Sequence, residues 1–123
     1  MRKCFCVLFL VLLGANAISQ TVDERSDIVA NVSAAKFKHL MDSLDGEVVG
    51  DLRTPEELKQ QGKIAGGLEI DYFSENFEAA IQAQDTNKVY LLYCAGGGRS
   101  GETAELMKNM GFKKIYNLAE GFK

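Results

Sequence analysis

The 123-residue chain lacks several features that would assign it to a particular class of protein. It has no tryptophan, one proline and one histidine, and no repeat or low-complexity segment, which argues against disordered and collagen-like chains. Its formal net charge of −3 gives no basic surface, so we expect no nucleic-acid partner. A composition of 46% hydrophobic and 25% charged residues at this length fits one small globular domain.

Long hydrophobic runs are also scarce. Cys4 to Leu13 is an apolar run of about ten residues, whereas a membrane-spanning helix needs roughly 20. The run follows Arg2 and Lys3 and precedes small residues ending at Ala17, which is the layout of a secretory signal peptide. We expect cleavage of residues 1–17 and export, to the periplasm in a bacterium and otherwise by secretion, without stable membrane insertion. An uncleaved anchor is the alternative.

The chain has three cysteines, two in the apolar run near the N-terminus and one in the predicted domain. Cleavage would remove Cys4 and Cys6 and leave Cys94 as the only thiol, so no internal disulfide could form. One histidine and one cysteine cannot assemble a metal site from familiar ligands, and we expect neither a metal nor another cofactor. The lone thiol of Cys94 therefore needs another explanation.

Hydrophobic periodicity predicts an α/β domain over residues 33–123, after a flexible polar lead-in at residues 18–32. Thr54, Pro55 and Glu57 form the pattern of a capped helix start. Strands that alternate with helices indicate a central parallel sheet with helices on both faces. The expected helices are 33–44, 55–61, 74–82 and 100–110, and the expected strands are 47–52, 68–70, 89–93 and 114–118.

Polar chemistry follows two of the expected strands, where sites lie in parallel α/β sheets. Asp51 and Arg53 lie at the carboxyl end of the first, and Cys94 follows the apolar strand 89–93. Three glycines after Cys94 let the backbone turn its N–H groups inward at a helix N-terminus, which makes an anion cradle. Arg99 adds a positive charge, so the pattern predicts a thiolate with a lowered pKa.

Four segments, in order, resemble the rhodanese-like sulfurtransferases. Cys94-x-x-Gly97-x-Arg99-Ser100 looks like the active-site loop of that family, and residues 51–57 are similar to its Asp-Val-Arg segment with the following acidic helix. Residues 62–67 resemble its Gly-His-Ile-Pro-Gly-Ala segment and residues 110–121 its closing Gly-Phe…Leu…Gly stretch. The resemblance covers Ser33 to Lys123.

This sequence departs from the family pattern at three points and stops short of one element. Lys63 and Ala65 replace the family's His and Pro, and Glu120 stands where a second Gly is common. The chain stops at Lys123, before the helix that closes the family's fold. We therefore expect a rhodanese-like α/β fold whose C-terminal helix is missing.

The resemblance implies a sulfurtransferase. Cys94 would take sulfane sulfur from a small donor such as thiosulfate, carry it as a persulfide and pass it to a thiol or cyanide. The same resemblance gives Arg99 a part in donor binding and makes Asp51 and Arg53 supports of the loop. A surface ion pair is the alternative for those two residues. An exported thiol would also need either a thiol reductant as partner or a stable persulfide. The backbone that would hold the sulfur anions comes from Ala95, Gly96, Gly97, Gly98, Arg99 and Ser100.

Three other functions compete with this reading. A cysteine phosphatase needs Cys-x5-Arg, whereas Arg99 follows Cys94 as Cys-x4-Arg. Gly96-x-Gly98-x-x-Gly101 matches a dinucleotide fingerprint, but too few residues follow Gly101 to complete such a domain. A non-catalytic sulfur-carrier or binding module would keep the fold without efficient turnover. Because Arg99 is the only cation in the loop, we expect weak activity on the thiosulfate dianion.

Overall fold

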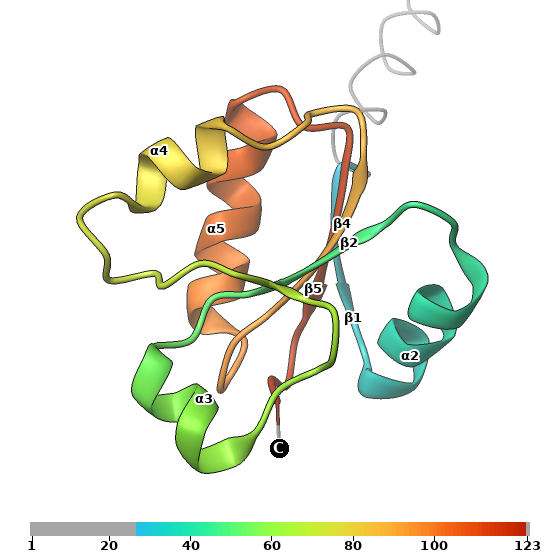
Figure 1. The fold of residues 1–123 in the computed structure, drawn as a ribbon. Helices are drawn as coiled ribbons and strands as arrows, with labels where there is room; N and C mark the ends of the chain where they lie inside the picture. The colour runs from blue at the N-terminus through green and yellow to red at the C-terminus, as the bar shows by residue number, and fades with distance from the viewer. Residues whose placement is uncertain (1–26, 123) are drawn as a thin grey trace, which may run out of the picture.

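Strand β4 (Val89–Tyr93) lies at the centre of a five-stranded parallel sheet in the computed structural model, which describes residues 27–122. The strand order is β1-β5-β4-β2-β3 (Figure 1). β4 pairs with β5 (Lys114–Leu118) on one side and with β2 (Val48–Asp51) on the other. The edge strands are β1 (Val29–Val32) and β3 (Leu68–Glu69). The apolar sequence of β4 is that of a strand covered on both faces, as expected.

Helices cover both faces of the sheet, as predicted. In Figure 1, α2 (Ala34–Ser43) lies on one side, and α3 (Pro55–Gln61), α4 (Phe77–Gln82) and α5 (Gly98–Asn109) lie on the other. The two-residue period of a strand divides β4 between two apolar clusters. Leu91 and Tyr93 pack with residues of α2. Leu92 and Cys94, which alternate with them, pack with residues of α4 and α5. The alternation thus sends Cys94 to the α5 side.

Local capping residues explain two of the four helix starts among residues 27–122. Ser33 caps α2, and Thr54 and Glu57 form the predicted capping box of α3. The expected start at Ser74 is wrong, because the Ser74 hydroxyl accepts a hydrogen bond from the backbone of Asn76 inside the preceding turn and α4 begins only at Phe77. Helix α5 begins at Gly98, two residues earlier than Ser100, so the glycine loop is shorter than expected.

The N-terminal boundary needs a correction. The sequence places residues 29–32 in a flexible lead-in, but they form β1, which pairs with β5 from Val29–Ile115 to Val32–Leu118. A contact with the far end of the chain creates this strand, so local polarity does not reveal it. The expected signal peptide at residues 1–17 lies outside the described residues. Within them, no helix follows β5, and no helix is long and apolar enough to cross a membrane.

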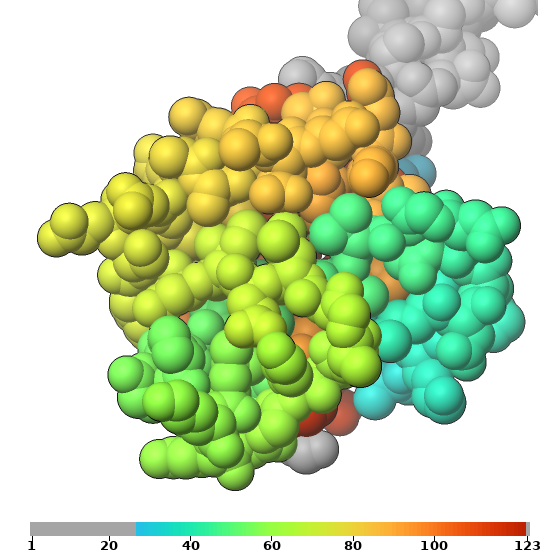
Figure 2. Space-filling model, viewed as in Figure 1, coloured from blue at the N-terminus to red at the C-terminus, as the bar shows by residue number. Residues whose placement is uncertain are grey.

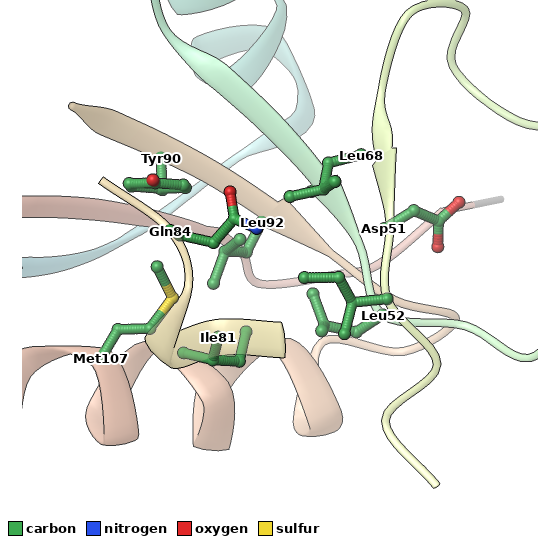
Figure 3. Close-up of a pocket in the computed structure, with 10 residues that line it drawn as sticks. Asp51, Leu52, Leu68, Ile81, Gln84, Tyr90, Leu92 and Met107 are labelled. Atoms are coloured by element: carbon green, nitrogen blue, oxygen red, sulfur yellow. The ribbon is translucent and has the colours of Figure 1, made fainter. Parts of the chain in front are cut away.

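The interior holds one small cavity of about 10 Å³ between the sheet and helices α4 and α5 (Figure 3). Leu52, Ile81, Leu92 and Met107 are among its mostly apolar walls. A space of that size is that of a single water and has no place for a substrate. Figure 3 also shows the carboxylate of Asp51 pointing away from this cavity, toward the carboxyl end of β2. In Figure 2 the segment from α3 through β3 to α4 covers much of the visible face.

Candidate active site

Cys94 lies directly after β4, where the chain leaves the sheet and turns into α5. Its side chain is 1% exposed and belongs to the apolar cluster on the α5 side. The connection to the helix is only Ala95, Gly96 and Gly97, since Gly98 already belongs to α5. The sulfur therefore faces the first turn of a helix whose N–H groups are free of helical partners.

Hydrogen bonds from this turn surround the sulfur. Cys94 Sγ accepts from the backbone N–H of Gly97 at 3.1 Å, from that of Ser100 at 3.4 Å and from the Ser100 hydroxyl at 3.3 Å. Burial is the largest single influence and raises the thiol's pKa, but the hydrogen bonds from Ser100, Gly96 and Gly97 together outweigh it and lower the pKa of Cys94. Gly97 and Ser100 thus place hydrogen-bond donors around the sulfur. Ala95, Gly98 and Arg99 make no hydrogen bond to Sγ among the described contacts.

The segment that follows β5 contacts the backbone of the loop at Cys94 and Ala95. The backbone N–H of Phe122 donates to the carbonyl oxygen of Cys94 at 2.8 Å. Gly121 has a φ of 79°, and a Cβ there would lie 2.1 Å from the carbonyl oxygen of Ala95. Only glycine fits such a close backbone approach. The shape of the loop thus depends on a segment more than twenty positions later in the chain.

Asn117 is a site residue that the sequence analysis missed. It is 4% exposed, and its side-chain amide donates to the carbonyl oxygen of Gly97 at 3.2 Å and to Asn31 at 3.0 Å. Its amide oxygen accepts from the Ser100 hydroxyl. One hydroxyl hydrogen therefore has three competing acceptors, which are Asn117 Oδ1, Cys94 Sγ and the carbonyl oxygen of Gly97. An amide within the last strand, β5, which neighbours the strand that carries the cysteine, was the available signal.

Arg99 binds the carboxylate of Glu57 and makes no described hydrogen bond to the sulfur, although the sequence predicted a role in donor binding. Its Nη1 and Nη2 donate to the two carboxylate oxygens of Glu57 at 2.9 and 2.8 Å. Hydrogen bonds from Arg99 and from the backbone of Thr54 lower the pKa of Glu57 to about 2. The guanidinium also lies over Phe73, with 5.6 Å between its central carbon and the ring centroid. Arg99, the one arginine of the loop, is thus paired with the carboxylate of Glu57.

Asp51 and Arg53 form a buried pair, so the alternative of a surface ion pair is wrong. Their side chains are 1% and 0% exposed, with Nε–Oδ1 and Nη2–Oδ2 distances of 3.0 and 2.8 Å. The Arg53 guanidinium lies 4.3 Å from the ring centroid of Phe122, whose N–H holds the carbonyl of Cys94. The pair makes no contact with Sγ and supports the loop through Phe122.

Within residues 27–122, no group of three histidine, cysteine, aspartate or glutamate side chains could hold a metal ion. The chemistry that these residues offer is that of one thiolate in a pocket of N–H donors. Such a pocket stabilises negative charge on Cys94.

The comparisons with known proteins agree with this geometry. The family model of the rhodanese-like domain matches residues 33–123. The chain is 29% identical over 126 residues to the tRNA uridine(34) hydroxylase of Erwinia tasmaniensis, covering 97% of the chain and 35% of that protein. It is 29% identical over 100 residues to the putative sulfur carrier protein YrkF of Bacillus subtilis, covering 81% of the chain and 52% of YrkF. The chain thus spans between a third and about half of these relatives.

A solved structure supports the same assignment. The rhodanese-like domain protein of Staphylococcus aureus has a TM-score of 0.65 with this structure at 23% identity, over 75% of this chain and 86% of that one. At this identity the likeness establishes the fold alone. The family match, in contrast, runs from the cap of α2 through the Cys94 loop to the end of the sequence. The chain therefore belongs to the rhodanese-like domain family.

Proposed function

We propose that the protein is a sulfurtransferase that moves sulfane sulfur from a small donor to a thiophilic acceptor through a persulfide on Cys94. The observation that carries this proposal is the set of hydrogen bonds from Gly97 and Ser100 to Sγ, together with the lowered pKa of the thiol. A thiolate is the nucleophilic form of cysteine. Here helix N–H groups and a hydroxyl generate it without a neighbouring general base.

The first half of the cycle loads the cysteine. The Cys94 thiolate attacks the terminal sulfur of the donor, a new S–S bond forms, and the donor's own bond to that sulfur breaks. The bonding electrons leave with the donor remainder, which is sulfite when the donor is thiosulfate. The persulfide carries the negative charge on its outer sulfur, one S–S bond beyond the Sγ atom that accepts from the N–H groups of Gly97 and Ser100.

The second half unloads it. A nucleophilic acceptor, such as a thiolate or cyanide, attacks the outer sulfur, and the Cys94 thiolate leaves in its original state. The N–H donors are already in place for a charged sulfur in both states, so little reorganisation is needed. Because Cys94 is 1% exposed, the site favours small donors and acceptors that present a single reacting atom.

Intact mass spectrometry tests this proposal. After incubation with thiosulfate or mercaptopyruvate, the wild-type protein should gain the mass of one sulfur atom, and dithiothreitol should remove it. The Cys94→Ser variant should gain nothing. Absence of an adduct with every donor would contradict the proposal.

A sulfur-carrier module is the second candidate, and one observation favours it. Arg99 is occupied by Glu57, which leaves the loop without a free cation for a dianionic donor. A relative bears the name putative sulfur carrier protein. A carrier would accept one sulfur per chain and release it to a specific thiol, with little repeated turnover in thiosulfate and cyanide. Multiple-turnover thiocyanate formation would favour the enzyme.

We also propose that residues 1–17 direct export and that a thiol reductant regenerates the cysteine. The charged start, the apolar run and Ala17 support this. Cell fractionation with N-terminal sequencing tests it. A chain that begins at Ile18 outside the cytoplasm is the expected result, and an intact N-terminus in the cytoplasm would contradict it.

A further inference from the structure

Both arginines of the described segment are already paired with carboxylates. Arg53 is held by Asp51, and Arg99 is held by Glu57 through two parallel hydrogen bonds. The side chains of Arg99 and Glu57 are 19% and 25% exposed, and Phe73 covers one face of the guanidinium. A bidentate pair of this kind is stronger than an exposed ion pair, since both donors and both acceptors are used.

An open groove beside Gly96, Gly97 and Gly98 includes Glu102 and Glu105 in its lining. Glu102 accepts a hydrogen bond from the Tyr72 hydroxyl, and Glu105 lies 3.8 Å from the ammonium nitrogen of Lys108. Glu57 stands on the Arg99 side of the loop and these two carboxylates stand along the groove. A donor with two negative charges therefore finds no unpaired arginine among residues 27–122, and the carboxylate of Glu57 lies beside the arginine of the loop.

We propose that Glu57 is a specificity-determining residue that occupies Arg99 and so disfavours dianionic donors, which makes sulfane-sulfur donors with at most one negative charge the preferred substrate class. This inference rests on the proposed sulfur transfer. Glu57 makes no described hydrogen bond to Cys94 and acts through Arg99. Its carboxylate neutralises the positive charge of the Arg99 guanidinium, which would otherwise attract the second negative charge of a donor.

Two donors of similar shape separate this effect from a general loss of activity. Thiosulfate has two negative charges, and methanethiosulfonate has one, because a methyl group replaces one oxygen. In both cases the Cys94 thiolate attacks the terminal sulfur and the S–S bond of the donor breaks. The electron pair leaves with sulfite in the first case and with methanesulfinate in the second, and both reactions give the same persulfide.

Glu57→Gln is the decisive variant, since glutamine also serves at this position of a capping box and can still accept from the backbone of Thr54. Glu56→Gln is the matched control, because Glu56 lies in the same first turn, is exposed and makes no described hydrogen bond. The ratio of loading rates, thiosulfate over methanethiosulfonate, should rise about fivefold to tenfold in Glu57→Gln, as expected for removal of one nearby charge. It should stay within about twofold of wild type in Glu56→Gln.

A second measurement does not require sulfur transfer. Iodoacetate and iodoacetamide alkylate the same thiolate but differ by one negative charge, and their rates can be followed on the peptide that contains Cys94. The iodoacetate to iodoacetamide ratio should rise several-fold in Glu57→Gln, and the rise should shrink in high salt. If no persulfide forms but this ratio rises, the proposed function is wrong and the role of Glu57 stands. If persulfide forms and neither ratio changes, the inference about Glu57 is overturned alone.

Discussion

Gly97 and Ala119 are so close that a Cβ atom on residue 97 would lie 2.1 Å from the Ala119 carbonyl oxygen. Gly97 also has a φ of 93°, in the left-handed region that other residues rarely adopt. The N–H group of this same residue donates to the Cys94 sulfur. The thiolate cradle therefore depends on a direct backbone contact between the loop and the segment that follows β5.

Gly97→Ala should accordingly damage both stability and reactivity. Backbone strain and the contact with Ala119 should lower the free energy of unfolding by about 3 kcal/mol or more. Urea denaturation measures this effect. Gly98→Ala is the control, because a Cβ at Gly98 meets nothing within 4 Å and the residue lies in the first turn of α5. That variant should be unchanged or more stable by up to about 1 kcal/mol. Equal losses in both variants would contradict the account.

The Ser100 hydroxyl should control the thiolate population. Its hydrogen bond to Sγ lowers the pKa of Cys94, so Ser100→Ala should raise that pKa and slow alkylation by iodoacetamide near neutral pH by about tenfold. The rate of alkylation as a function of pH gives the midpoint directly. Thr103→Ala removes another buried hydroxyl from the same helix, one that bonds to the carbonyl of Arg99 and not to sulfur. The pH midpoint of Cys94 alkylation in Thr103→Ala should stay at the wild-type value. A shift of this midpoint as large as in Ser100→Ala would argue against a specific effect of the Ser100 hydroxyl on the thiol.

Asn117→Asp should lower both the stability of the protein and the thiolate population of Cys94. The substitution removes the amide donor to Gly97 and places a carboxylate near the Ser100 hydroxyl. Repulsion from the Gly97 carbonyl should cost about 2–4 kcal/mol of stability, and the added negative charge should raise the pKa of Cys94. Thermal unfolding and the alkylation profile report the two effects. Asn31→Ala removes an exposed partner of Asn117. If Asn31→Ala lost as much stability as Asn117→Asp, a special role for Asn117 would be refuted.

The ion pair of Glu57 with Arg99 should appear in acid unfolding. The folded-state pKa of Glu57 is lowered to about 2 from an ordinary value of 4.5, so the folded protein binds fewer protons than the unfolded chain between these values. The pair therefore contributes its full stability above about pH 4.5 and loses it as the pH falls toward 2. Allowing for partial exposure, we expect about 1–2 kcal/mol.

Glu57→Gln should lack this part of the pH dependence. Denaturant unfolding between pH 5 and about pH 2 tests the prediction, with Glu56→Gln as the control that keeps the wild-type slope. The prediction fails if wild type and Glu57→Gln lose stability in parallel over this range.

Local patterns predicted much of the fold. Five continuous apolar or β-prone residues defined β4, and Lys114–Leu118 defined β5 with the same bounds as in the structure. The capping box of α3 needs only Thr54 and Glu57, three positions apart, and it was predicted correctly. The Cys94 cradle was also predicted, because a strand, glycines and a helix start follow one another in sequence.

Contacts between distant segments escaped prediction. Strand β1 exists because it pairs with β5, at the other end of the domain. Arg99 lies 42 positions from Glu57, and no local pattern shows that the first turns of α3 and α5 meet. The burial of Asp51 and Arg53 depends on Phe122 and Tyr93 covering the guanidinium. The order of strand, glycine turn and helix around Cys94 was therefore visible in the sequence, whereas the ion pairs around it were not.

Stoichiometric transfer from the loaded protein tests the central claim most directly. The protein is loaded with a sulfane-sulfur donor, freed of excess donor and mixed with cyanide, and thiocyanate is measured beside the intact mass. The account predicts about one thiocyanate per loaded chain, together with loss of one sulfur atom from Cys94 and no product from Cys94→Ser. Loaded sulfur on another residue, or thiocyanate formation that survives in Cys94→Ser, would contradict it.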